Sequence, residues 1–355
     1  MKKLLLALLV VGLVAAACGG SDDDGDAVSS ASDVATTSTT DAPSSASEPS
    51  GSDVADSTTS VAETTTTAAP STRVVEHAFG TAEVPGVTER IVVMDPGTIL
   101  PTLLFLGVDS IVAAPLPEEP FPTTLVTEDD LAGIATVGLP EVSFELVAAA
   151  QPDVIIGFDL GLQESYDQLS QIAPTVAVEL DLNDWRGTGE RVAAALGLEV
   201  EMAEALADYD ERVATLQASI GDPSAIDVSI ARALGQVIRL HTKFHFAGQV
   251  LDDVGFGRPD SQTTDDPETR LVQVSLEELP MADADHLFVF GAGQFGSLGG
   301  DGVSEVVQEI LDHPLYPTLG VAETGNVHVV DPLGWQQGGL PAANLILDDL
   351  EGVFS

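Results

Sequence analysis

The basic side chains of this sequence are its strongest candidates for binding chemistry, because they are so few. The 355 residues include 57 Asp and Glu but only 12 Lys and Arg, and the formal net charge at pH 7 is −45. Arg232 and Arg239 fall in two consecutive apolar runs of the second half. The planar donor fork of arginine suits clusters of anionic oxygen atoms. We therefore expect both arginines to bind a ligand, with surface ion pairing in an acidic protein as the alternative.

A second group of cationic side chains follows at His241, Lys243 and His245. One interpretation is an axial ligand for haem iron. Another is a divalent metal site, although two histidines without a clear third ligand fall short of the usual coordination. A solvent-exposed turn is the commonest origin of such a cluster, and it is our expectation here.

No sequence motif indicates catalysis. Neither GxSxG nor HExxH occurs, and no histidine stands in a convincing relation to a nucleophile. A secreted hydrolase is therefore the less favoured alternative, and no catalytic residue or direct metal ligand is expected. The strong negative charge also makes nucleic acid an unsuitable partner.

The elements that would position these side chains alternate between strands and helices. Apolar runs at 90–94, 108–114, 154–158, 228–233, 236–240, 286–290 and 326–330 are typical of buried strands. Helical patterns occupy 99–106, 143–150, 246–254 and 341–354. This alternation predicts an α/β fold in which mostly parallel sheets are flanked by helices.

The folded part is longer than a usual single domain, so two lobes are expected. The longest helical stretch covers 189–220, with Gly197 as a possible interruption. We predict a first lobe at 73–182, a connecting region at 183–221 formed by one long rigid helix, and a second lobe at 222–355.

Ligands of open α/β sheets bind beyond the carboxyl ends of the strands. For each phenylalanine at these ends core packing is the more common role and ligand contact the alternative, whereas Trp335 stands among glycines and is expected to contact the ligand. The glycine-rich run at 291–300 is expected to form a flexible wall of the cleft. The candidate ligand-binding residues at these strand ends are Asp95, Pro96, Phe158, Leu160, Phe290, Phe295, Trp335 and Gln336.

The first residues indicate export. Lys2 and Lys3 precede an apolar run at 4–17 that is too short to span a bilayer and is typical of a secretory signal. Ala15–Ala17 followed by Cys18 resembles the lipobox of bacterial lipoproteins, in which the cysteine is lipidated. We predict a signal peptide at 1–17, then the lipidated Cys18 and a disordered Ser/Thr/Asp tether at 18–72.

One short pattern occurs twice. Ser143-Phe144-Glu145 precedes Pro152-Asp153 and a strand, and Ser275-Leu276-Glu277 precedes Ala284-Asp285 and a strand, at one constant offset. Such self-similarity is expected when two lobes share one supersecondary plan.

Taken in order, these segments resemble the iron–siderophore and cobalamin class (class III) of periplasmic-binding-protein-like ABC transporter components. The likeness is strongest to the ferric-siderophore lipoproteins of actinobacteria and covers nearly all of 73–355. The matching stretches are Glu76–Gly80 with Glu83–Pro85, Arg90–Val93, Ser143–Glu145 with Gln151–Ile155, Ile172–Thr175, Phe246–Gly255, Ser275–Glu277 with Ala284–Asp285, Trp335–Gly339 and Leu347–Leu350.

The resemblance implies that two lobes joined by a helix hold a ferric siderophore in the cleft between them, with small closing motions and without a cofactor. It implies that similar positions to Arg232 and Arg239 carry basic residues. It also implies that Glu145 and Glu277 dock onto arginine pockets of the two subunits of an ABC permease dimer, which works with an ATPase. A carboxylate favoured at a helix start is the alternative.

The implied location is the outer face of the cytoplasmic membrane, where the protein would be held by its lipid anchor as a monomer. A lipoprotein that binds haem or cobalamin on the same fold remains the alternative function. A purely adhesive surface lipoprotein would not need the paired glutamates.

Overall fold

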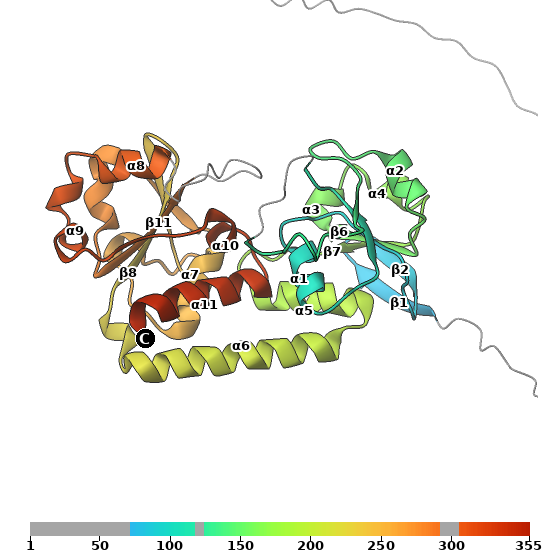
Figure 1. The fold of residues 1–355 in the computed structure, drawn as a ribbon, viewed down its shortest axis with the longest axis horizontal. Coiled ribbons are helices and arrows are strands. Elements are labelled where there is room, and N and C mark those ends of the chain that lie inside the picture. The colour runs from blue at the N-terminus through green and yellow to red at the C-terminus, as the bar shows by residue number, and fades with distance from the viewer. Residues whose placement is uncertain (1–71, 118–123, 292–304) are drawn as a thin grey trace, which may run out of the picture. The chain divides into compact units, whose positions relative to one another are not determined.

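The computed structural model describes residues 72–117, 124–291 and 305–355 (Figure 1). The expectations for the signal peptide, Cys18, the tether up to residue 71, Phe295 and most of the glycine-rich run lie outside these residues. In the part of the chain that is described, no helix has the length and apolar character needed to cross a membrane.

The first lobe contains a five-stranded parallel sheet with the order β5-β4-β3-β6-β7. Its strands are β3 Ile91–Val93, β4 Ile111–Ala114, β5 Ala135–Thr136, β6 Val154–Phe158 and β7 Thr175–Val178. Every residue of β3 and β6 is buried, as expected for central strands covered by helices on both faces. The edge strand β7 is buried along its whole length as well. The helices are α1 Ile99–Phe105, α2 Phe144–Ala149, α3 Asp159–Leu162 and α4 Tyr166–Leu169.

A β-hairpin that the sequence patterns did not predict precedes this sheet. It pairs β1 Thr72–His77 with β2 Gly80–Pro85 in antiparallel register. The amide of Ala78 in its turn donates to the carbonyl of Ala177 in β7 at 3.0 Å, which places the hairpin beside the sheet edge.

The sheet of the second lobe has the order β10-β9-β8-β11-β12 and is mixed. Strands β8, β11 and β12 are parallel, whereas β9 is antiparallel to both β8 and β10. Only three residues separate β8 from β9, and a parallel crossover needs a dozen or more. The strands are β8 Val228–Ala233, β9 Val237–His241, β10 Leu271–Ser275, β11 His286–Gly291 and β12 Val327–Val329.

The helices of the second lobe pack on both faces of this sheet. Figure 1 shows α7 and α11 between the sheet and the long helix α6. The α-helices are α7 Phe246–Val254, α8 Glu305–Leu311, α9 Gly320–Thr324, α10 Pro332–Gln336 and α11 Leu340–Phe354. The 3₁₀ turns are η1 Pro223–Ala225, η2 Asp260–Gln262, η3 Leu276–Ala282 and η4 Tyr316–Thr318.

Two helices, α5 Trp185–Leu196 and α6 Glu199–Ile220, connect the lobes where one long helix was predicted. The break falls at Gly197, whose φ of 77° is left-handed and ends α5. The 22-residue helix α6 then runs to the second lobe. Arg212 fixes it there through ion pairs with Asp348 and Glu351 of α11, at 2.6 and 3.0 Å.

Candidate functional site

A cavity of about 210 Å³ lies where the two lobes meet. Its walls come from the carboxyl ends of β3 and β6 in the first lobe, from the start of α5, and from the segments before β10 and after α10 in the second. The rule that ligands bind beyond strand ends therefore selects the same place as the geometry. The lining residues used below are Asp95, Thr102, Phe158, Trp185, Arg270 and Gln336.

On the side of the first lobe, Asp95 and Phe158 line the cavity as predicted. The Asp95 carboxylate accepts hydrogen bonds from the amides of Thr98 and Ile99 at 2.7 and 2.8 Å, so it also caps the start of α1. Burial raises the pKa of Asp95. The neighbouring Thr102 was not predicted, and its buried Oγ1 has no hydrogen-bond partner among the described residues.

On the side of the second lobe, Gln336 and Arg270 line the cavity. The Gln336 Oε1 is buried and has no partner in the described part of the chain. Arg270 was missed by the sequence patterns. Its guanidinium donates to the carbonyl of Phe244 at 3.1 Å and to that of Leu182 at 3.3 Å, and Leu182 belongs to the segment before α5.

The lobes approach each other closely at this cavity. Gly339, with φ of 94°, follows α10, and a Cβ atom placed there would lie 2.8 Å from Thr102 Oγ1. A side chain at this position would be strained and would push against the opposite lobe. The glycine therefore lets the loop reach the first lobe beside Thr102 Oγ1 and Gln336 Oε1, which have no hydrogen-bond partner in the described ranges.

Arg232 and Arg239 are direct cross-strand neighbours on β8 and β9. Phe290 of β11 is the partner of Arg232 on its other side. Neither arginine has a carboxylate oxygen within 4.0 Å among the described residues, and the Arg232 Nε is buried without a partner. Burial, and then the charge of Arg239, lower the pKa of Arg232. The alternative of surface ion pairing therefore finds no support at these two residues.

The expectation of a solvent-exposed turn at His241 and His245 is wrong. Their side chains are buried, with ring centroids 3.7 Å apart, because His245 stands at the start of α7, which packs over the end of β9. Burial places the pKa of His241 well below its usual value and, with the charge of Arg270, lowers that of His245 to about 3. Both rings are neutral at pH 7. No group of three possible metal ligands occurs among the described residues.

Several predicted contacts lie away from the cavity surface. Trp335 is 0% exposed. Its ring stacks on that of Phe288 with 4.7 Å between the ring centroids, and its Nε1 donates to the carboxylate of Asp349 at 2.7 Å. Phe290 is equally buried and Pro96 is also buried, whereas Leu160 is 67% exposed and does not line the cavity. For Trp335 the expectation of direct ligand contact is wrong in this conformation, since the glycines around it conceal a core position. For Phe290 the structure shows core packing.

The two glutamates of the repeated pattern are both exposed at the starts of short helices. Ser143 caps α2 by accepting from the amide of Leu146 at 3.3 Å. In the second lobe the carboxylate that completes the capping box with Ser275 belongs to Glu278, at 3.0 Å, and not to Glu277. Capping therefore does not account for Glu277.

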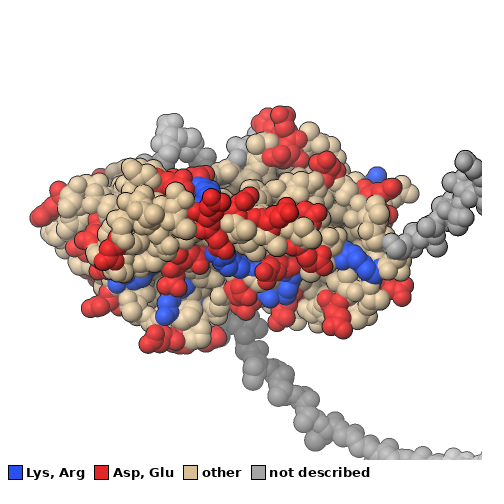
Figure 2. Space-filling model, turned by 90° about the horizontal axis from the view of Figure 1, so that it is seen from below, with Lys and Arg blue, Asp and Glu red and all other residues tan. Residues whose placement is uncertain are grey.

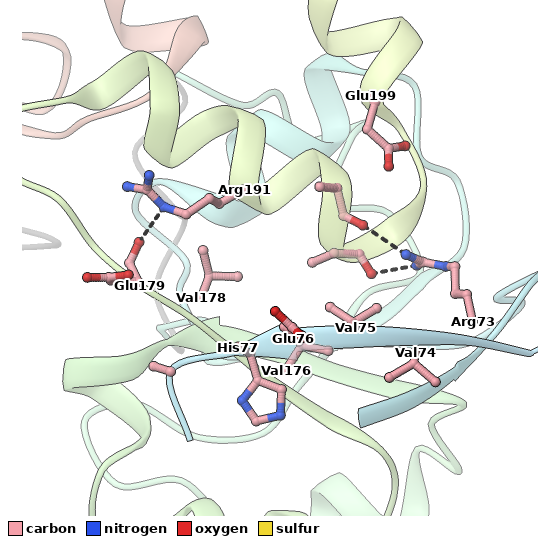
Figure 3. Close-up of a pocket in the computed structure, with 13 residues that line it drawn as sticks. Arg73, Val74, Val75, Glu76, His77, Val176, Val178, Glu179, Arg191 and Glu199 are labelled. Atoms are coloured by element: carbon pink, nitrogen blue, oxygen red, sulfur yellow. Dashed lines mark hydrogen bonds between the residues drawn. The ribbon is translucent and has the colours of Figure 1, made fainter. Parts of the chain in front are cut away.

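A larger cavity, of about 600 Å³, lies within the first lobe between β1, β7 and α5 (Figure 3). Its cations already have partners. Arg73 donates to the carbonyls of Ala194 and Ala195 at the end of α5, and the Arg191 Nε donates to the carbonyl of Glu179 at 3.1 Å. This cavity does not bring the two lobes together, so the interlobe cavity is the better candidate site.

Comparison with known proteins agrees with this architecture. The model of the periplasmic binding protein family matches residues 116–332. The chain is 34% identical over 294 residues to the probable siderophore-binding lipoprotein YfiY of Bacillus subtilis. The alignment covers 80% of this chain and 88% of YfiY. It is 24% identical over 268 residues to the Fe(3+)-citrate-binding protein YfmC of the same organism, covering 74% and 80%.

Among solved structures, SirA of Staphylococcus aureus complexed with staphyloferrin B superposes with a TM-score of 0.65 at 27% identity, covering 79% of this chain and 97% of SirA. The family match spans more than half of the chain, and its relatives are binding proteins. This chain belongs to the periplasmic binding protein family.

Proposed function

We propose that this protein is the extracellular substrate-binding component of an ABC importer and that it captures a ferric siderophore for delivery to the permease. One observation carries the proposal: the interlobe cavity is lined from both lobes by buried polar atoms, Thr102 Oγ1 and Gln336 Oε1, that have no hydrogen-bond partner among the described residues. Such atoms cost free energy unless a ligand satisfies them. The siderophore-binding relatives support the same conclusion.

In this proposal the protein holds its cargo without changing it. The siderophore supplies the ligands of the iron, and the protein supplies a shaped cavity with Phe158 and Trp185 as its apolar part. Gln336 and the neighbouring arginines then contact oxygen atoms at the surface of the chelate. No covalent step is required, so the protein is not an enzyme.

Delivery requires attachment and docking. We propose that Cys18 carries the lipid that holds the monomeric protein at the outer face of the cytoplasmic membrane. Glu145 and Glu277 lie exposed on different lobes, so each lobe can offer one anion to one subunit of a permease dimer. The ATPase partner would act from the other side of the membrane.

The test is a titration of the full chain, followed by intrinsic tryptophan fluorescence. The probes are ferric hydroxamate, catecholate and carboxylate siderophores, with haem and cobalamin as rivals. We expect submicromolar binding of at least one ferric siderophore. Binding of haem or cobalamin alone, or of none of the probes, would contradict the proposal.

Two cavity variants connect this binding to the site. Thr102→Val and Gln336→Ala should each weaken binding by about 2- to 10-fold, the usual worth of one hydrogen bond. Thr215→Val, at an exposed position of α6, is the matched control and should leave affinity unchanged. Equal affinity in all three variants would remove the cavity from the proposal.

A further inference from the structure

The interlobe cavity is small for the ligand that the proposed function assigns to it. Its volume is about 210 Å³. Pockets that enclose a drug-sized molecule measure about 300 to 1,000 Å³, and a ferric siderophore is at least as large as such a molecule. In this conformation the cavity therefore fits one substituent of the chelate, and the rest of the chelate stays outside it.

One part of the cavity wall is apolar. Phe158 at the end of β6, Trp185 and Val192 of α5, and Phe246 at the start of α7 all line it. These side chains are almost fully buried. An alkyl chain placed against them would be removed from water, which stabilises its binding.

The polar atoms of the cavity that lack partners are hydrogen-bond acceptors. Gln336 Oε1 can only accept, Thr102 Oγ1 can accept, and both are buried without a partner among the described residues. The Asp95 carboxylate accepts from backbone amides at the start of α1. It has no Lys, Arg or His nitrogen within 4.0 Å in the described part of the chain. These acceptors suit a ligand group that carries several donors.

The charges around the cavity favour a cation as well. Its charged lining residues are Asp95, Asp181 and Arg270. Burial lowers the pKa of Arg270 and the charge of Asp181 opposes this shift, so these two partly compensate each other. Burial raises the pKa of Asp95, and no described cation offsets its charge. The net charge of the protein is −45, acidic side chains are spread over the face in Figure 2, and this field attracts cations.

Other kinds of substituent fit these observations less well. An anionic group would bring further acceptors and a negative charge to a carboxylate. A purely alkyl group would leave buried acceptors unpaired, which costs free energy. An ammonium group carries three donors and a positive charge, and the cavity offers it the oxygen atoms of Asp95, Thr102 and Gln336.

We infer that the interlobe cavity receives a cationic arm of the bound chelate, an alkyl chain that ends in an ammonium group held by Asp95, Thr102 and Gln336. We call these three residues the arm site. The inference rests on the proposed function and names a substituent of its ligand. The apolar side chains around Trp185 then pack against the alkyl part of the arm.

The experiment compares three probes that share one type of iron centre, by isothermal titration of the full chain. Ferrioxamine B is a linear ferric trihydroxamate with an alkylammonium arm. Its N-acetyl derivative keeps the arm and replaces the ammonium by a neutral amide, and ferrioxamine E is cyclic and has no arm. We expect ferrioxamine B to bind about 10- to 100-fold more tightly than either other probe, the usual contribution of hydrogen bonds to a charged group.

Two variants connect this preference to the arm site. Asp95→Asn retains an oxygen that can accept from the amides of Thr98 and Ile99, and it should weaken ferrioxamine B about 10- to 100-fold. Thr102→Val should weaken ferrioxamine B about 2- to 10-fold. Both should leave ferrioxamine E within about 2-fold of the parent, since that probe has no arm.

Asp208→Asn is the matched control for the removal of charge. It removes one exposed carboxylate on α6 and should change the affinity for none of the probes. Thermal melting of each variant verifies that it is folded.

The outcomes separate the two proposals. Equal affinity for ferrioxamine B and its N-acetyl derivative, unchanged by Asp95→Asn, would overturn the arm site and leave siderophore capture standing. The arm site would also be wrong if another ferric siderophore bound and ferrioxamine B did not. Failure of every ferric siderophore to bind the parent protein would overturn siderophore capture itself, and the arm site with it.

Discussion

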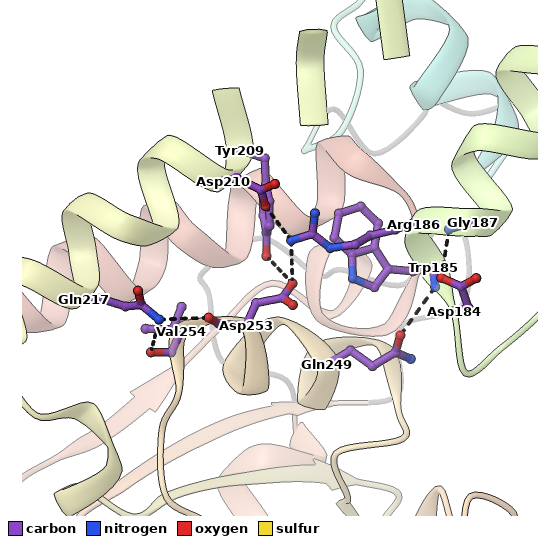
Figure 4. A network of polar contacts seen from close by, with 10 residues as sticks. All are labelled: Asp184, Trp185, Arg186, Gly187, Tyr209, Asp210, Gln217, Gln249, Asp253 and Val254. Atoms are coloured by element: carbon purple, nitrogen blue, oxygen red, sulfur yellow. Dashed lines mark hydrogen bonds and ion pairs between the residues drawn. The ribbon is translucent and has the colours of Figure 1, made fainter. Parts of the chain in front are cut away.

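Tyr209 of α6 donates a hydrogen bond of 3.0 Å to the carboxylate of Asp253 at the end of α7. Arg186 of α5 reaches the same carboxylate at 3.2 Å and that of Asp210 at 2.8 Å, so three helices meet at one acidic side chain (Figure 4). Nearby, Gln249 of α7 donates to the carbonyl of Leu182 before α5 at 3.0 Å. The second lobe is thereby fixed to the connecting helices, and we expect only small closing motions when ligand binds.

The first prediction concerns the stability of this junction. Asp253→Ala should lower the free energy of unfolding by about 2 to 4 kcal/mol, because it leaves the buried Tyr209 and the partly buried Arg186 without their shared acceptor. Tyr209→Phe should cost about 1 kcal/mol. Urea denaturation measures both.

Asp210→Ala is the matched control, since Asp210 contacts the same arginine from an exposed position. It should cost no more than about 0.5 kcal/mol, as exposed ion pairs usually do. An equal loss in the Asp210 and Asp253 variants would show that burial of the junction does not matter.

The second prediction assigns the fluorescence signal. Trp185 and Trp335 are the only tryptophans of the chain, and Trp185 lines the cavity whereas Trp335 is buried against Phe288. Trp185→Phe should abolish most of the change in emission that ligand causes, and Trp335→Phe should retain it. Trp335→Phe should also cost about 2 kcal/mol or more in stability, because Asp349 loses its donor and the core loses volume. A signal that survives only in the Trp185 variant would reverse the assignment.

Local patterns predicted most of the helices and strands. The expected helix at 246–254 matches α7 residue for residue, because an apolar stripe ends at Gly255, which has a left-handed φ of 88°. The hairpin of β1 and β2 was missed because its residues alternate between exposed and buried or half-buried positions, so that it contains no continuous apolar run. The antiparallel direction of β9 follows from the short turn between β8 and β9, and the pattern of apolar residues does not indicate strand direction.

The site was predicted less completely, since burial is a property of packing. Asp95, Phe158 and Gln336 follow from the strand-end rule and do line the cavity. Trp335 and His241 stand among residues that are typical of surface loops. Both side chains are nevertheless buried in the folded protein, because neighbouring elements pack over them. The scarcity of basic residues could have identified Arg270. In a chain with so few Lys and Arg, an arginine next to a predicted strand is a candidate for ligand binding.

The third prediction concerns pH. The pKa values of His241 and His245 lie below the ordinary value of about 6.5 in the folded protein, and that of His245 is about 3. Below pH 6.5 the unfolded chain therefore binds protons that the folded protein does not. Stability contributed by these neutral rings is complete above pH 6.5 and is lost as the pH falls toward 3, by up to about 1.4 kcal/mol per pH unit for each histidine.

Replacement of His245 by Gln isolates this contribution. Urea denaturation at pH 7 and pH 5 should show a smaller loss of stability on acidification in the variant than in the parent. Buried carboxylates such as Asp253, whose pKa is raised by burial, act in the opposite direction, and the comparison at matched pH cancels them. Identical pH dependence in both proteins would contradict a neutral buried His245.

The fourth prediction separates binding from delivery. Glu145 and Glu277 are exposed and take no part in the site, and Leu146 and Met281 are exposed apolar side chains close to them in sequence. The double variant Glu145→Arg with Glu277→Arg should lower uptake of ⁵⁵Fe-labelled siderophore by cells at least about tenfold, because in the proposed docking each reversed charge would be repelled by the arginines of the permease. Ligand affinity in solution should stay within about 2-fold of the parent, since neither residue lines the cavity.

Glu204→Arg is the control for this prediction. It reverses an exposed charge on α6 and should leave both uptake and affinity unchanged. Normal uptake in the double variant would exclude paired docking through these glutamates, and a matching loss of ligand affinity would place them in the binding site instead.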